Sequence, residues 1–468
     1  MRKINYEKDD YWRLGFHLMP MTGWLNDPNG LCWFRGYYHF FFQYSPEDPL
    51  GGLKKWGHYR SEDLLKWEFM GISLRPEEQF EKDGIYSGSA FAASEGMHLF
   101  YTGNVKMEGD FNYLTEGRQG NTIYAFSEDG IHFSKKKCIL TNADYPNNLT
   151  LHVRDPKVWK EVKEDCDEYF MVLGARNLDD KGVALIYHSL DLNNWTFCNE
   201  VSSKDKFGYM WECPDVFRVA EKKVLSVCPQ GVNPDQLNYQ NIYQSGYFIY
   251  EGELTGNYHL FEFKEWDRGF DFYAPQTFED HLGRRILVAW MGMADTPEHR
   301  NPTVSMGWQH ALTIPREIKV LDGQLVQQPV TEMIKLRNKR IIWNGRGRMQ
   351  PCSCYETIIE NHGNGNVMIQ WENDLIADFD SNKEIFSLTF TNGKDGLGKG
   401  RDTRGVNLKS CRKIQVFVDA SSIEIFLNDG EEVFTTRFYP NEGRSSMMIS
   451  GEDYTADAWE LNKMIVYN

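Results

Sequence analysis

Three acidic residues stand in short stretches that resemble one another, and each could act as an acid, a base or a nucleophile. Asp27 lies in "GWLNDPNG", Asp155 in "LHVRDPKVW" and Glu212 in "YMWECPDVF". Proline and glycine alone would make "DPNG" an ordinary tight turn. However, enzymes that cleave glycosidic bonds usually use a pair of carboxyl groups in different protonation states. These acids can act together only if the fold brings them to one place.

The neighbours of the three acids suggest different roles. Glu212 is flanked by tryptophan, cysteine and proline, an apolar setting that would raise its pKa by desolvation and suit a proton donor. Asp27 follows Asn26 and precedes the N–H groups of a turn, which can keep it ionised. Asp155 follows Arg154, so we expect an ion pair that keeps Asp155 charged and suits it to binding sugar hydroxyl groups. A structural ion pair or a turn cap is the alternative for each acid taken singly.

A repeat in the first two thirds of the chain indicates how these acids could meet. The pattern Ser-x-Asp followed by an aromatic residue recurs in "SEDLLKW", "SEDGIHF" and "SLDLNNW", which begin at Ser61, Ser127 and Ser189. Short runs such as "MHLFYTG" and "EYFMVLGAR" lie between them and are typical of antiparallel strands. Several short strands in each repeat of about 60 residues are typical of β-propeller blades.

A second series with similar spacing runs out of phase with the first. From Asp27, steps of about 60 residues reach Ser87, Asp155, Glu212 and Asp271. We predict a five-bladed β-propeller over residues 1–330, in which the innermost strand of each blade borders one central channel. Residues at corresponding positions would then face one another at one mouth of the channel. The alternative is a set of unrelated surface turns.

The pattern of the sequence changes after about residue 330. Segments such as "VMIQWEN", "IFSLTFTN" and "KIQVFVDASSIEIFLNDG" alternate apolar and polar residues between polar turns. Ile414, Val416 and Val418 fall on one face of such a strand. This pattern predicts a β-sandwich over residues 331–468. The expected fold is therefore all-β, a five-bladed β-propeller followed by a C-terminal β-sandwich.

Composition limits the classes of partner. The 468 residues include 51 Lys and Arg against 67 Asp and Glu, a formal charge of −16, which argues against nucleic acid and anionic membranes. No apolar run is long enough to span a bilayer, and the first residues lack the apolar core of a secretory signal. Nine cysteines without metal-binding spacing indicate reduced thiols in the cytoplasm and no metal or other cofactor. The sequence leaves a homo-oligomer open.

The motifs around the three acids resemble those of glycoside hydrolase family 32, the β-fructofuranosidases. "HLMPMTGWLNDPNGL" resembles the nucleophile motif of that family, "LHVRDPKVW" its Arg-Asp-Pro motif and "WECPDVF" its Glu-Cys motif. "FFQY", "YSGSA", "FDFYAPQTF" and "GWQHALTIPRE" are further matches, and "VDASSIEIFLNDGEEVFTTRFYP" resembles the family's sandwich signature. The resemblance implies metal-free retaining hydrolysis of terminal β-D-fructofuranosyl groups by a five-bladed propeller with a β-sandwich behind it.

The resemblance also implies a role for each matching residue. Asp27 would be the nucleophile and Glu212 the acid/base, while Asp155 would bind fructose hydroxyl groups and stabilise the transition state. The substrate-binding residues carried over in the same way, the last three on less decisive matches, are Arg154, Asn26, Gln43, Trp56, Ser87, Asp271, Trp24, Tyr273 and Trp290.

Several small-molecule sugars fit this interpretation. Sucrose or sucrose 6-phosphate is the first choice of substrate, and short fructo-oligosaccharides are the second. A related propeller acting on arabinosides or xylosides, a non-catalytic carbohydrate-binding propeller and an interaction scaffold are the alternatives. The presence of all three acids favours catalysis over binding alone. The sequence does not indicate which basic residue would hold a phosphate group.

Overall fold

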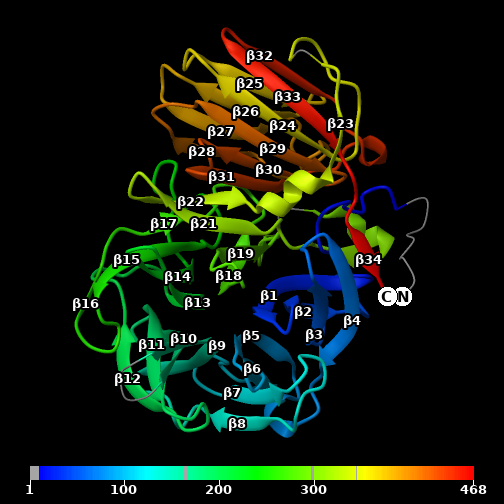
Figure 1. The fold of residues 1–468 in the computed structure, drawn as a ribbon. Coiled ribbons are helices and arrows are strands. Elements are labelled where there is room, and N and C mark those ends of the chain that lie inside the picture. The colour runs from blue at the N-terminus through cyan, green and yellow to red at the C-terminus, as the bar shows by residue number, and fades with distance from the viewer. Residues whose placement is uncertain (1–9, 163–166, 297–299, 344) are drawn as a thin grey trace.

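Strands dominate the chain. The structure is a computed structural model that describes residues 10–162, 167–296, 300–343 and 345–468. In these ranges the strands form seven sheets, and the helical segments are short 3-10 turns. Five sheets lie around a common centre and two stack beyond them, as Figure 1 shows. The fold is all-β, a five-bladed propeller followed by a β-sandwich, as the sequence predicts.

Each propeller blade is an antiparallel meander of successive strands. Blade 1 contains β1 (Gly23–Phe34), β2 (Tyr37–Ser45), β3 (Lys55–Ser61) and β4 (Lys66–Leu74). Blade 2 contains β5 (Ile85–Ala92), β6 (Met97–Lys106), β7 (Arg118–Ser127) and β8 (Lys137–Leu140). Blade 3 contains β9 (Leu149–Val162), β10 (Asp167–Asn177), β11 (Gly182–Ser189) and β12 (Thr196–Val201). Blade 4 contains β13 (Met210–Val219), β14 (Lys222–Gln230), β15 (Gly246–Gly252), β16 (Tyr258–Leu260) and β17 (Lys264–Glu265). Blade 5 contains β18 (Tyr273–Glu279), β19 (Arg285–Trp290), β21 (Arg316–Leu321) and β22 (Gln324–Pro329).

The innermost strand of every blade carries the same irregularity. In β1, β5, β9, β13 and β18, two consecutive residues face a single residue of the second strand. Such bulges turn side chains out of the regular alternation of a strand and often lie beside functional sites. In three of them Asp155, Cys213 and Ala274 precede a proline with φ angles of 63°, 46° and 50°, a costly conformation at that position. The five bulges surround a narrow axial cavity of about 10 Å³.

The repeated Ser-x-Asp segments form one kind of turn. Each joins the third strand of a blade to the fourth, in blades 1, 2 and 3. One carboxylate oxygen of Asp63, Asp129 and Asp191 accepts the backbone N–H two residues later, at 2.9, 2.8 and 2.9 Å. The shared hydrogen bonds explain why the sequence repeats there, and the predicted repeat is confirmed.

The C-terminal sandwich consists of two antiparallel sheets around one apolar core. The first sheet contains β23 (Arg337–Arg340), β24 (Tyr355–Asn361), β29 (Lys413–Asp419), β30 (Ser422–Leu427), β31 (Glu432–Arg437) and β33 (Tyr454–Leu461). The second contains β25 (Val367–Trp371), β26 (Leu375–Asp380), β27 (Ile385–Phe390), β28 (Thr403–Asn407) and β32 (Met447–Gly451). The alternation seen in the sequence directs Ile414, Val416 and Val418 into this core.

The propeller and the sandwich are joined by a strand and by buried charges. The last strand, β34 (Ile465–Tyr467), follows the sandwich and pairs with β4 of blade 1. The short β20 (Trp308–Gln309), which lies between β19 and β21 in the chain, pairs with β1 within the propeller. His17 of the propeller bonds Asp419 and Glu424 of the sandwich at 2.8 and 2.9 Å, and all three side chains are fully buried. Buried ionic contacts tolerate little misplacement, so they fix the sandwich against the propeller.

Candidate active site

The acids singled out from the sequence meet at the bulges of the innermost strands. Cys213 marks the meeting point, because its Sγ lies 3.9 Å from Oδ2 of Asp27 and 3.7 Å from Oδ2 of Asp155. Asp27 and Asp155 lie within their bulges, whereas Glu212 lies immediately before its bulge. The three acids therefore converge without being strictly equivalent. An approximate repeat in a sequence cannot reveal an offset of one residue.

Asp27 is held by hydrogen-bond donors. The Ser87 hydroxyl donates a short hydrogen bond to Oδ2, and Asn26 Nδ2 donates to Oδ1 at 3.0 Å. These donors are themselves positioned, since Gln43 Nε2 donates to Ser87 Oγ and Trp24 Nε1 donates to Asn26 Oδ1, each at 2.7 Å. Burial raises the pKa of Asp27, and the two donors to its carboxylate oppose that rise. The four predicted neighbours thus surround this acid.

Glu212 lies in a polar setting rather than the apolar one expected from its sequence neighbours. Arg154 donates to Oε1 from Nε and Nη2, at 3.0 and 2.7 Å. Gln230 Nε2 and the Tyr273 hydroxyl donate to Oε2, at 2.7 and 2.6 Å. The expectation of an apolar setting is wrong because consecutive side chains of a strand point to opposite faces. The partners of Glu212 come from other strands.

Asp155 is not hydrogen-bonded to Arg154, contrary to the expectation from their adjacency. The bulge turns Asp155 away, and its Oδ2 accepts the backbone N–H of Cys213 at 2.9 Å. Burial raises the pKa of Asp155 to about 7, with Arg154 opposing the rise and the charge of Glu212 adding to it. The expected direct pairing of Asp155 with Arg154 is therefore wrong, because Arg154 bonds Glu212 instead. That Asp155 acts as a charged group stays a prediction.

The predicted tryptophans lie in different environments. Trp24 is partly exposed, with its ring 6.0 Å from that of Trp290 and 4.4 Å from that of His310. Trp290 belongs to the same apolar cluster as Tyr273. Trp56 is fully buried and donates to the backbone carbonyl of the residue before Ser87. Trp24 and Trp290 therefore contact residues of the site, Asn26 and Tyr273 respectively. Trp56 contacts the backbone next to Ser87. Its contact with a sugar stays a prediction.

Asp271 makes its contacts with the sandwich. It lies just ahead of β18, and Arg401 donates two hydrogen bonds of 2.6 Å to its carboxylate. The backbone N–H of Arg437 donates another at 2.8 Å. The structure thus brings Asp271 into an ion pair between the two domains. Its predicted contact with a sugar stays a prediction.

Three residues of the site were missed from the sequence. Gln230 bonds Glu212, and His152 Nδ1 lies 2.9 Å from Nη1 of Arg154. Lys54 places its Nζ 4.7 Å from the centre of the Trp24 ring, and burial lowers its pKa to about 8. Neither spacing nor composition distinguishes these residues from others of their type. Their contacts with the site become visible only in the folded chain.

The geometry suits acid–base and nucleophilic chemistry. Two carboxyl groups with different partners lie close to Cys213, one held by neutral donors and one by an arginine. Among the described residues, no group of three or more His, Cys, Asp or Glu is arranged to hold a metal ion. In the same ranges, every helix is too short or too polar to cross a bilayer. The arrangement matches the paired carboxyl groups that glycoside cleavage requires.

Two family models match most of the chain. The model of the glycosyl hydrolases family 32 N-terminal domain matches residues 17–329, and that of the family 32 C-terminal domain matches residues 375–463. The chain belongs to glycoside hydrolase family 32. The two matched ranges fall on the propeller and on the sandwich, and the family membership makes this chain a glycoside hydrolase.

Similar proteins agree with this family. A sucrose-6-phosphate hydrolase of Bacillus subtilis is 39% identical over 96% of this chain and 93% of its own length. The structure of a sucrose-6-phosphate hydrolase from Lactobacillus gasseri has a TM-score of 0.87 at 29% identity, covering 97% of this chain and 94% of the other. A Bombyx mori family 32 β-fructofuranosidase in complex with sucrose has a TM-score of 0.83 at 29% identity, covering 98% and 95%.

Proposed function

We propose that this family 32 enzyme hydrolyses terminal β-D-fructofuranosides with retention of configuration, and that its substrates are sucrose and sucrose 6-phosphate. The observation that carries the proposal is the convergence of Asp27, Asp155 and Glu212 around Cys213. The names of the curated relative and of the first structural neighbour support the phosphorylated disaccharide. The bound sucrose of the second neighbour supports sucrose itself.

The proposed mechanism is a double displacement. Asp27, whose carboxylate oxygens accept hydrogen bonds from Ser87 and Asn26, attacks the anomeric carbon of the fructosyl group. Glu212 gives its proton to the departing glycosidic oxygen and then takes one from the water that releases fructose. Arg154 fixes the Glu212 carboxyl group on one oxygen and Tyr273 on the other, which orients it for both transfers. Asp155 is proposed to bind fructose hydroxyl groups and stabilise the transition state.

Variants of the two reacting acids test the proposal. We expect Asp27→Asn to lower kcat on sucrose by about 10³-fold or more, because the nucleophile is lost. Glu212→Gln should lower it by about 10²- to 10⁴-fold on sucrose but far less on an aryl β-fructofuranoside, whose leaving group needs no proton. Asp129→Asn, a change in a turn acid of blade 2, is the matched control and should leave kcat unchanged.

Stereochemistry provides an independent measurement. In water–methanol mixtures, a retaining enzyme must form the methyl β-fructofuranoside, which proton NMR distinguishes from the α anomer. Formation of the α anomer would contradict the double displacement. Equal losses in Glu212→Gln on the two kinds of leaving group would contradict the role given to Glu212. Hydrolysis of a short inulin-type oligomer in preference to both disaccharides would contradict the choice of substrate.

The compartment and the partners are also part of the proposal. We infer a cytoplasmic enzyme that acts on an imported sugar, because the eight cysteines that the structure describes are all free thiols. The formal charge of −16 supports the expectation that nucleic acids and anionic membranes are not partners.

A further inference from the structure

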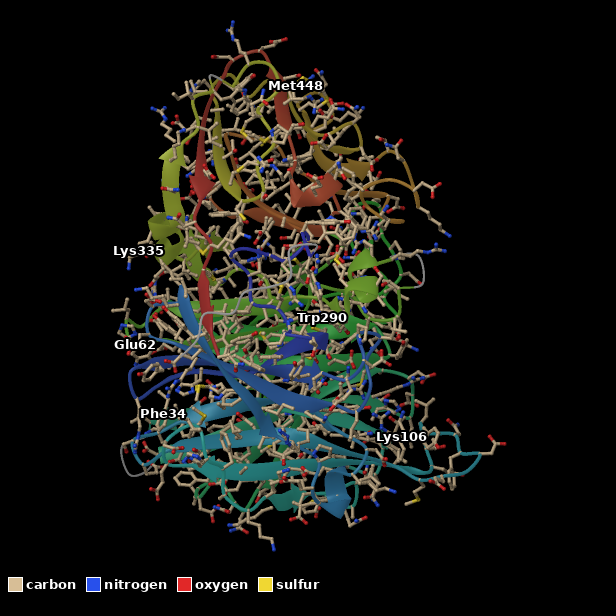
Figure 2. All side chains as sticks on the ribbon, turned by 90° about the vertical axis from the view of Figure 1, so that its right-hand side faces the viewer. Phe34, Glu62, Lys106, Trp290, Lys335 and Met448 are labelled. Atoms are coloured by element: carbon tan, nitrogen blue, oxygen red, sulfur yellow. The ribbon has the colours of Figure 1, made fainter. Side chains whose placement is uncertain are left out.

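Arg118 is a cation near the active site that has no acidic partner among the residues that the structure describes. It opens β7 and pairs in register with Lys106 of β6. Figure 2 shows Lys106 and Phe34 on opposite sides of the propeller, with Trp290 between them. The Cζ atom of Arg118 lies 5.9 Å from the ring centre of Tyr86, the residue before Ser87. Within the described ranges, no carboxylate is in ion-pair contact with its guanidinium group.

A short row of basic side chains leads from Arg118 to the proposed acid. Nη1 of Arg118 lies 3.4 Å from Nε2 of His152, whose Nδ1 lies 2.9 Å from Nη1 of Arg154. Arg154 in turn bonds Glu212. Burial and the charges of the two arginines lower the pKa of His152 to about 2, so the imidazole between them is neutral. Since Glu212 compensates Arg154, the positive charge of Arg118 is left uncompensated at the outer end of the row.

An uncompensated, partly buried guanidinium group favours a bound anion. Its planar donors match two oxygens of a phosphate group, an arrangement that a lysine cannot reproduce. The chain as a whole, with a formal charge of −16, repels a phosphorylated sugar, so a cation at the site gives that sugar a local attraction. The desolvation of Arg118 is costly when nothing pairs with it, and a phosphate would offset that cost.

The position of Arg118 relative to Glu212 identifies the part of the substrate that it meets. Glu212 protonates the leaving-group oxygen in the proposed mechanism, and Arg118 lies beyond Arg154 on the side of that acid. We propose that Arg118 forms a phosphate subsite that binds the 6-phosphate of a glucosyl leaving group. The inference rests on the proposed function and names the residue that would distinguish sucrose 6-phosphate from sucrose.

Two other cations near the site are less suited to this role. Arg176 is already paired with Asp180, whose Oδ1 accepts from Nε at 2.9 Å. Lys54 lies over the Trp24 ring and interacts with the charge of Asp27, on the side of the proposed nucleophile. A phosphate held by Lys54 would therefore sit beside the fructosyl group. Arg118 lies on the side of the acid, beyond Arg154, which Glu212 already pairs.

Kinetics on the two disaccharides test the subsite. We expect Arg118→Gln to lower kcat/KM on sucrose 6-phosphate by at least about tenfold, the effect of losing a charge-assisted hydrogen bond. On sucrose the same variant should change kcat/KM by less than about threefold, because that substrate lacks the phosphate. Arg118→Lys should retain part of the preference, since the charge remains and the paired geometry is lost. Unfolding midpoints of the variants check that each is folded.

Matched controls separate the subsite from its alternatives. Arg218→Gln removes an exposed arginine of β13 and should leave both substrates unaffected. Equal losses on both disaccharides in Arg118→Gln, or no loss on either, would overturn the subsite while leaving the proposed function intact. Loss of the phosphate preference in Lys54→Gln but not in Arg118→Gln would also overturn it. Failure of the unaltered enzyme on both disaccharides would instead overturn the proposed function.

Binding of a product gives a measurement that does not depend on turnover. We expect calorimetry to show tighter binding of glucose 6-phosphate than of glucose, with the difference abolished in Arg118→Gln. Equal binding of the two sugars to the unaltered enzyme would contradict the subsite. Inorganic phosphate at the same concentration is the control for a general anion site. If it binds as tightly as glucose 6-phosphate, the site does not recognise a phosphosugar and the proposal is contradicted.

Discussion

The Asp155 carboxyl group combines deep burial with a negative neighbour. Its side chain is 6% exposed, and burial together with the charge of Glu212 raises its pKa to about 7, although Arg154 opposes the rise. The ordinary value is 3.8, so the folded chain binds more protons than the unfolded chain between about pH 4 and pH 7. The contribution of Asp155 to the free energy of unfolding therefore falls as the pH rises through this window. Placing this acid in the site costs stability at neutral pH.

Replacing Asp155 by asparagine should remove the hydrolytic activity and stabilise the folded chain. We expect Asp155→Asn to abolish hydrolysis and to raise the free energy of unfolding at pH 7 by about 1–3 kcal/mol, since the buried charge is removed and the amide oxygen can still accept from Cys213. The gain should shrink toward zero near pH 4, where the native aspartate is protonated as well. Thermal unfolding at a series of pH values measures both. A variant less stable than the native chain at pH 7 would contradict this account.

The sequence predicts the reacting residues better than their partners. Asp27, Asn26 and Ser87 are brought together as the motifs imply, because the repeat directs them to the same channel. The partner of Arg154 could not be predicted, since hydrogen bonds between blades depend on a bulge that shifts the alternation of β9. Asp271 illustrates the same limit from the other side. Its contact with Arg401 joins residues 130 positions apart, so no local sequence pattern predicts it.

At the scale of the structural element, the turn between the third and fourth strands is the unit that repeats. In blade 3, the Asp191 carboxylate accepts from the backbone N–H groups of Asn193 and Asn194 at 2.9 and 2.8 Å. Leu64 and Leu192 have φ angles of 62° and 61° at the next position, where blade 2 has a glycine. The hydrogen bonds hold leucine in a conformation that it otherwise avoids. This turn is therefore readable from the sequence as a pattern.

Removing the acid from one of these turns should destabilise the blade in a pH-dependent way. Backbone hydrogen bonds from Asn194 and Asn193 hold the pKa of Asp191 below its usual range, so its contribution is present above about pH 4 and lost as the pH falls. We expect Asp191→Ala to lower the free energy of unfolding by about 1 kcal/mol at pH 7 and by less at pH 3. Asp179→Ala, at an exposed acid of the same blade, should cost less than about 0.5 kcal/mol. Equal effects of the two changes in urea titrations would contradict the role of the turn.

At the scale of the whole molecule, acidic side chains of the sandwich pair with buried basic side chains of the propeller. Figure 1 shows the sandwich stacked beyond blade 5, whose strands β21 and β22 lie next to β31. Arg316 of β21 is fully buried and bonds Asp267 of the propeller at 3.0 Å and Glu424 of the sandwich at 3.2 Å. Separating the domains would break the ion pair between Arg316 and Glu424. We propose that the propeller ends and the sandwich begins at residue 330, where the five-blade pattern ends. We also propose that the two domains unfold together.

Breaking this network should destabilise both domains at once. We expect Arg316→Met to lower the free energy of unfolding by about 3–5 kcal/mol, because two buried carboxylates lose their shared cation. Calorimetry should show a single transition at a lower temperature, since His17 and Arg316 both tie the propeller to the sandwich. Arg340→Met, at an exposed pair with Asp457, is the matched control and should cost less than about 1 kcal/mol. Two separate transitions, of which only one moves in Arg316→Met, would mean that the domains unfold independently and that the buried charges do not couple them.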